Sequence, residues 1–63
     1  MSEVWEEITA ECDGKIFKGF YRTVGNTVTV KTPLGMKAAQ LSGLTPSYLA
    51  KMLLRELARE RRA

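Results

Sequence analysis

The 63-residue chain has no histidine and only one cysteine, Cys12. An intrachain disulfide is therefore excluded, and a zinc site would have to rely on carboxylates, which structural zinc sites seldom use alone. No apolar run approaches the ~20 residues that span a bilayer, and the opening residues, MSEVWEE, are acidic where a signal peptide is basic. We therefore expect a soluble cytoplasmic protein without a cofactor, a bound metal or a membrane contact.

The chain is also too short for more than one domain, which we expect to span residues 1–63. Its composition, 44% hydrophobic and 27% charged, is typical of a globular protein. The charge is unevenly distributed: residues 1–13 hold five acidic residues and no base, whereas residues 14–63 hold all ten bases and two acidic residues. Because neighbouring antiparallel strands commonly carry opposite charges, we interpret the two segments as adjacent strands that neutralise each other.

Turn signals divide the first two thirds of the chain. Asp13-Gly14 and Gly25-Asn26 are two-residue hairpin turns, since their residues tolerate the positive φ that such turns require. The segment 32–35, Thr-Pro-Leu-Gly, is interpreted as a type I turn closed by a left-handed Gly35. The predicted strands are residues 4–12, 15–24, 27–32 and, as a fourth strand that the pattern leaves open, 36–41.

The two hairpin turns define one shared face of the sheet. The first places Cys12 opposite Lys15, the second places Val24 opposite Thr27, and opposed residues lie on the same face. The inner face predicted in this way contains Val4, Ile8, Ala10, Cys12, Phe17, Tyr21, Val28 and Val30. Gly19 also lies on this face, where it would permit either a bulge or the close approach of another element.

A helix is predicted to close the core. Thr45 is a suitable N-cap, Pro46 suits the first helical position, and no glycine or proline follows as far as Arg62. The apolar arc of this helix contains Leu49, Ala50, Leu53, Leu54 and Leu57. We therefore predict an α+β fold, in which a three- to four-stranded antiparallel β-meander over about residues 4–41 precedes one long C-terminal helix over about residues 46–62, packed on the inner face.

No set of side chains in the sequence predicts an enzyme. Glu7 and Glu11 would lie on an open, wet sheet surface, and Glu56 and Glu60 would lie on an exposed side of the helix among arginines, so we interpret both pairs as solvated surface charge. Cys12 has no partner base and is predicted to be a buried structural thiol. We therefore expect a small non-enzymatic interaction module with no catalytic residue.

Self-association is the expected interaction, because so short a chain has a small core and neither a disulfide nor a metal to reinforce it. The candidate interface residues lie on the outer face of the sheet and at the margin of the wide helical arc: Trp5, Ile16, Phe20, Val24, Leu54 and Ala58. The register also sets Trp5 opposite Arg22, which favours a cation–π contact. A homodimer is the first expectation, and another protein is the second.

Nucleic-acid binding is the alternative function. Bases interleaved with aromatic residues on a sheet suit a single strand, which is bound by stacking and by charge. The candidate anion surface would use Lys18, Arg22 and Lys31 of the sheet with Lys51, Arg55, Arg59 and Arg62 of the helix. Glu7 and Glu11 on the same sheet face would repel phosphate, so a nucleic-acid accessory domain ranks below a protein interaction module.

One resemblance covers nearly the whole chain. It rests on Trp5, Asp13-Gly14, Phe17, Gly19, Tyr21, Val28-Thr29-Val30, Gly35, Lys37, Gln40-Leu41, Gly43, Leu49-Ala50 and Leu53-Leu54-Arg55-Glu56-Leu57. In these positions the sequence resembles short uncharacterised bacterial proteins that pair a small antiparallel sheet with a C-terminal leucine-rich helix. The resemblance implies a bacterial cytoplasmic protein, and it assigns no activity and no site residue.

Overall fold

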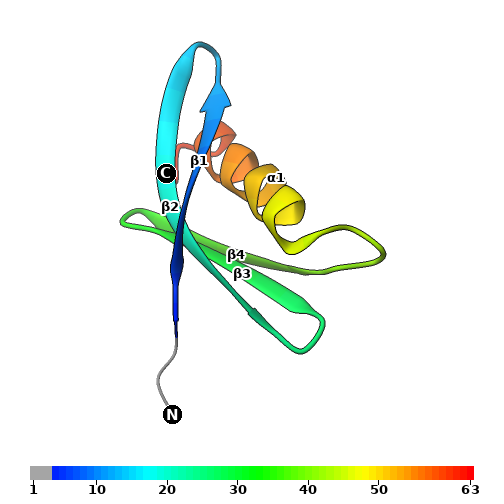
Figure 1. The fold of residues 1–63 in the computed structure, drawn as a ribbon. Helices are drawn as coiled ribbons and strands as arrows, with labels where there is room; N and C mark the ends of the chain where they lie inside the picture. The colour runs from blue at the N-terminus through cyan, green and yellow to red at the C-terminus, as the bar shows by residue number, and fades with distance from the viewer. Residues whose placement is uncertain (1–3) are drawn as a thin grey trace.

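Four strands precede one helix in the computed structural model, which describes residues 4–63 (Figure 1). The elements are β1 (Glu6–Cys12), β2 (Lys15–Val24), β3 (Thr27–Thr32), β4 (Gly35–Gln40) and α1 (Pro46–Arg59). The strands pair antiparallel in the order β1-β2-β3-β4, so each is hydrogen-bonded to its neighbour in the sequence. The predicted α+β meander is confirmed, and its fourth strand is present.

The register predicted from the two hairpin turns is confirmed. Cys12 pairs with Lys15 and Val24 with Thr27, and the pairing continues without interruption along each hairpin. Asp13 and Gly14 both have positive φ, 55° and 77°, as a type I′ turn requires. Both turns are therefore short enough to fix which side chains share a face.

The third turn differs from its prediction. Pro33 and Leu34 form the loop, and Gly35 is already the first residue of β4, paired with Thr32 and without the positive φ that was expected. The space around Gly35 explains why a glycine stands here. A Cβ atom at this position would lie 2.8 Å from Nε and 2.9 Å from Cβ of Arg62, so the absent side chain lets the end of the chain pack on the strand.

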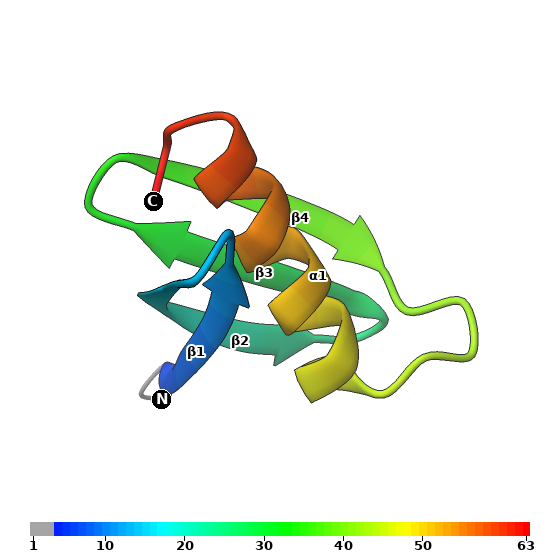
Figure 2. The ribbon, with the colours of Figure 1, turned by 90° about the horizontal axis from the view of Figure 1, so that it is seen from above.

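The core lies between α1 and the inner face of the sheet (Figure 2). It contains Ile8, Ala10, Val28, Val30, Leu49, Ala50, Leu53, Leu54 and Leu57. Phe17 and Tyr21 are half-buried and pack against this cluster, as their predicted face requires. The prediction that Val4 belongs to the inner face is wrong, since this residue is 71% exposed. It precedes Glu6, the first paired residue of β1, and so lies beyond the core. Cys12, at the end of β1, is half-buried rather than buried.

Gly19 allows a close approach and not a bulge. The β1–β2 pairing runs through Ile8 and Gly19 without an inserted residue. A Cβ atom at Gly19 would lie 3.1 Å from the carbonyl oxygen of Lys31 and 3.2 Å from Cδ1 of Leu54. The missing side chain therefore leaves the space that α1 fills above the middle of the sheet.

The two ends of α1 are capped differently. At the start, the backbone N–H of Tyr48 donates to Oγ1 of the predicted N-cap, Thr45, over 3.3 Å. At the end, the helix stops at Arg59 rather than at Arg62, because Arg61 has a φ of 59° and reverses the chain. The N–H groups of Arg61 and Arg62 donate to the carbonyls of Ala58 and Leu57, over 3.0 and 2.7 Å, which is a Schellman motif.

Candidate functional site

Four of the six candidate interface residues lie on the face of the sheet opposite α1: Trp5, Ile16, Phe20 and Val24. Figure 1 shows that α1 covers only the other face. Along β2 the face opposite α1 alternates between apolar and basic side chains, in the order Ile16, Lys18, Phe20, Arg22 and Val24. Ile16 is 74% exposed and Val24 63%, so both are open to a partner. A base separates each apolar residue from the next, and these three apolar side chains therefore do not form one continuous apolar surface along the strand.

Trp5 lies on this face under two cations. Cζ of Arg22 is 4.9 Å from the centre of the indole ring, which confirms the predicted cation–π contact. Nζ of Lys31 is closer, at 4.1 Å, and the sequence interpretation missed it. The register could have revealed this contact, since it places Lys31 opposite Phe20 on the same face as Trp5. At that position a long lysine side chain can reach Trp5 diagonally. The indole ring therefore contacts two cationic side chains, one from β2 and one from β3.

The seven bases of the candidate anion surface are not brought together. Lys18, Arg22 and Lys31 lie on the open face of the sheet, and Lys18 also approaches Glu7 at 3.7 Å. The helix covers the inner face of the sheet, so its exposed bases lie on the other side of the molecule. These bases are Lys51, Arg55 and Arg59. Arg62 has left the helix and lies against Gly35. The candidate anion surface is therefore split between the two sides of the molecule.

The two helical interface candidates occupy different environments. Leu54 is completely buried within the chain, against the position of Gly19, so its predicted place at a surface is corrected: this side chain is needed to fill the core. Ala58 is half-buried beside a groove of about 600 Å³ between the end of α1 and the tip of the β1–β2 hairpin. Lys15, Arg59 and Phe17 also line this groove, which mixes bases with apolar side chains.

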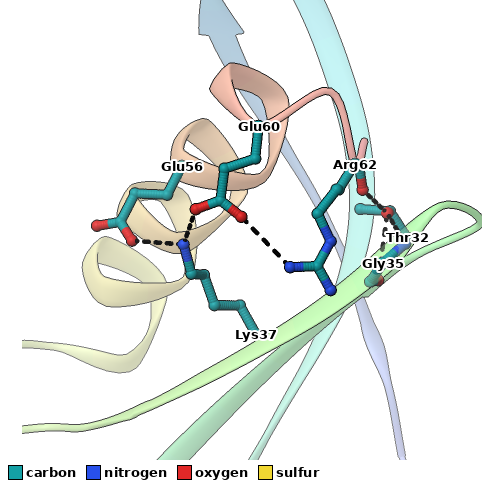
Figure 3. Close-up of polar contacts among 6 residues, drawn as sticks. All are labelled: Thr32, Gly35, Lys37, Glu56, Glu60 and Arg62. Atoms are coloured by element: carbon teal, nitrogen blue, oxygen red, sulfur yellow. Dashed lines mark hydrogen bonds and ion pairs between the residues drawn. The ribbon is translucent and has the colours of Figure 1, made fainter.

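An ion-pair cluster connects α1 to β4 and was not predicted (Figure 3). Nζ of Lys37 lies 3.1 Å from Oε1 of Glu56 and also contacts Glu60, whose other oxygen is 3.3 Å from a guanidinium nitrogen of Arg62. Hydrogen bonds to Glu60 and then Glu56 raise the pKa of Lys37. The hydrogen bond from Lys37 lowers the pKa of Glu60. The register could have revealed the cluster, since Lys37 opposes the buried Val30 and therefore faces the helix.

Thr32 holds the end of the chain against the β3–β4 turn (Figure 3). Its hydroxyl oxygen accepts hydrogen bonds from the N–H groups of Leu34 and Gly35, over 3.2 and 3.1 Å. The same hydroxyl donates to the carbonyl oxygen of Arg62. One side chain therefore shapes the turn and anchors the segment that follows α1.

The two edge strands of the sheet are β1 and β4. In each, every second residue directs its backbone N–H and C=O groups away from the neighbouring strand, and the two strands differ in which residues do so. The N–H of Leu41 donates to the carbonyl of Asn26 over 2.9 Å, which sets the alternation along the β3–β4 ladder. By that alternation, Met36, Ala38 and Gln40 direct their N–H and C=O groups outward. The same alternation, counted from the loop-closing pair of Cys12 and Lys15, gives Glu7, Thr9 and Glu11 on β1. One edge therefore carries two carboxylates, and the other carries no charge at its outward positions.

Residues 4–63 contain no group of three or more potential metal-ligating side chains placed to hold an ion. Nor does the described part of the chain contain a helix long and apolar enough to cross a membrane. Comparison with known proteins finds no matching family model, no similar curated protein and no similar solved structure.

Proposed function

We propose that this protein is a small non-enzymatic interaction module that associates with a second copy of itself as a homodimer. The observation that carries the proposal is the division of apolar side chains between the two sides of the sheet. A buried cluster lies under α1, whereas Ile16, Val24 and Met36 on the open face are 74, 63 and 54% exposed. A chain of this length buries little of its surface by itself, so contact with a second copy, on the open face or at the sheet edge that carries Met36, would bury surface that one copy cannot.

The chemistry of the described side chains supports a binding role rather than a catalytic one. Cys12 makes only a weak 3.9 Å contact with the carboxylate of Asp13, which cannot act on the thiol as a catalytic dyad partner such as histidine would. Glu56 and Glu60 are engaged with Lys37, and hydrogen bonding lowers the pKa of Glu60, the direction opposite to that needed for a general acid.

Sedimentation equilibrium of the full chain at micromolar concentration tests this proposal. The expected mass is twice the 7.1 kDa of one chain, and a single 7.1 kDa species would overturn it. An oligonucleotide titration at low and high salt adds the alternative as an outcome. Tight binding that falls steeply with salt would favour the nucleic-acid function instead, because phosphate contacts release counterions.

A further inference from the structure

We infer that the homodimer forms by antiparallel pairing of β4 with the β4 strand of the second copy, centred on Ala38, so that two four-stranded sheets become one. The inference rests on the proposed self-association and names the surface that carries it. An exposed strand edge presents unpaired N–H and C=O groups in a row and is a ready template for another strand. The difference between the two edges decides which one serves.

The β1 edge is unsuited to strand pairing. Its outward backbone groups belong to Glu7, Thr9 and Glu11, and charged side chains at an edge oppose the addition of a further strand. Two such edges brought together would also place carboxylates against carboxylates. Pairing of β1 with a β4 edge would not close on itself and would build a filament rather than a dimer.

The β4 edge has none of these obstacles. Its outward groups belong to Met36, Ala38 and Gln40, which are uncharged and exposed. The one charged residue of β4, Lys37, points to the helix side and is neutralised by Glu56 and Glu60 of its own chain. A second copy therefore meets an edge with free hydrogen-bonding groups and no uncompensated charge.

Symmetry restricts the register of this pairing. A two-fold axis perpendicular to the sheet makes the two β4 strands antiparallel and keeps both helices on the same side of the joined sheet. Such an axis sets one central residue of β4 opposite its own equivalent in the second copy. The two registers with the greatest overlap of the strand Gly35–Gln40 are centred on Lys37 and on Ala38. A centre at Lys37 would set the two long Lys37 side chains directly opposite each other, each already held by Glu56 and Glu60 of its own chain, and so would crowd the two ion-pair clusters together.

The register centred on Ala38 is better in its hydrogen bonds as well. It sets Ala38 opposite the partner's Ala38 and Met36 opposite the partner's Gln40, and all of these residues direct their backbone groups outward. Opposed residues of this kind exchange both N–H···O=C bonds. This register therefore makes three reciprocal pairs, whereas a centre at Lys37 makes two, and the small side chain of Ala38 lets the central pair approach.

Matched proline variants test the edge. Ala38→Pro removes an N–H that points away from β3, so it breaks no hydrogen bond of the β3–β4 ladder, and edge positions of this kind tolerate proline. Thr9→Pro is the control, because its N–H points outward from the β1 edge in the same way. We expect sedimentation to give a folded 7.1 kDa species for Ala38→Pro and a dimer for Thr9→Pro, with circular dichroism reporting the fold.

Disulfide trapping tests the register and does not depend on the proline variant remaining folded. Ala38→Cys in a Cys12→Ser background places one thiol at the proposed centre, within reach of its equivalent. A register shifted to Lys37 would move the two thiols beyond the ~7 Å Cα separation that a disulfide spans. We expect mild oxidation to convert this variant to a covalent dimer, and the matched Thr9→Cys variant in the same background to remain uncrosslinked.

The outcomes separate the surface from the proposed function. A wild-type chain that sediments as a monomer overturns the homodimer, and the β4 pairing with it. A wild-type dimer whose Ala38→Cys variant crosslinks no faster than Thr9→Cys overturns only the β4 pairing and directs attention to the open face of the sheet. A dimer that persists in a folded Ala38→Pro protein contradicts the β4 pairing in the same way.

Discussion

The two faces of the sheet are built from the same strands, but one face forms the hydrophobic core and the other is exposed. On the covered face, Ile8, Val28 and Val30 join the helical leucines in a cluster that includes no buried polar side chain among residues 4–63. On the open face, exposed apolar residues alternate with bases, and the contacts include the exposed ion pair of Lys18 with Glu7 and half-buried cation–π pairs such as Lys31 with Trp5. An exposed ion pair contributes about 1 kcal/mol or less, and a partly desolvated cation–π pair about 1–2 kcal/mol. The comparison indicates that most of the stability resides on the covered face, whereas the open face holds the exposed apolar side chains.

Removal of a core side chain should have the largest effect. Leu57 is completely buried, so Leu57→Ala is expected to lower the free energy of unfolding by about 2–5 kcal/mol through lost burial and the cavity left behind. Ile16→Thr is the matched change on the open face and should stay within about 0.5 kcal/mol, because Ile16 is 74% exposed. Urea unfolding followed by circular dichroism measures both, and equal losses would contradict the division between the faces.

An added methyl group should show how closely the helix approaches the sheet. Gly19→Ala places a Cβ atom 3.1 Å from a backbone oxygen of β3 and 3.2 Å from Leu54, so either α1 or the sheet must shift, at a cost of about 1–3 kcal/mol. Lys18→Ala, one residue away on the open face, loses only an exposed 3.7 Å ion pair. A Gly19→Ala protein as stable as the wild type in thermal unfolding would show that the helix does not lie this close.

Removal of the Thr32 hydroxyl should lower the stability less than the two core changes. Thr32→Val keeps the shape of the side chain and removes the oxygen that bonds Leu34, Gly35 and Arg62, so we expect a loss of about 1–2 kcal/mol. Thr29→Val is the control on the open face, where the residue opposes Arg22 and Ala38. Proteolysis of the C-terminal segment should accelerate in Thr32→Val alone, and equal rates in the two variants would count against the anchor.

The ion-pair cluster should give the smallest effect, visible in its dependence on pH. Because Lys37 lowers the pKa of Glu60, their pairing contributes fully above the ordinary carboxyl value of 4.5 and is lost as the pH falls through the folded-state pKa. The pKa of Lys37 is raised from 10.5, so on the alkaline side the contribution is lost as the pH rises through that higher value. Both groups are partly exposed, which limits the effect.

Thermal unfolding of the wild type and of Lys37→Met between pH 7 and pH 3 measures this contribution. The wild type should have the higher Tm at pH 7, and the two values should converge below pH 4.5. A constant difference across this range would mean that the pairing with Glu60 is not its source.

Most of the fold was predictable because short turns determine the register locally. Asp13-Gly14 and Gly25-Asn26 leave two residues each for the loop, and every pair from Cys12 with Lys15 onward then follows by alternation. The helix start was predictable for the same reason, since Thr45 and Pro46 act within one turn.

The features that escaped prediction depend on long-range placement or on an unusual residue. The helix ends early because Arg61 takes the left-handed conformation that glycine usually supplies, so no glycine marked the end. The Lys37 cluster depends on where α1 crosses β4, a geometry that the helical period does not specify. Leu54 was misplaced because the width of an apolar arc does not reveal which residue meets a glycine across the core.

The exchange of two backbone amides tests the central claim most directly. The N–H groups of Ala38 and Thr9 point outward from opposite edges of the sheet, and neither bonds to the neighbouring strand of its own chain. Hydrogen exchange measured by NMR at a concentration where the protein is associated should show slow exchange at Ala38, faster on dilution, and rapid exchange at Thr9 throughout. Rapid exchange at both positions, whatever the concentration, would contradict association through the β4 edge.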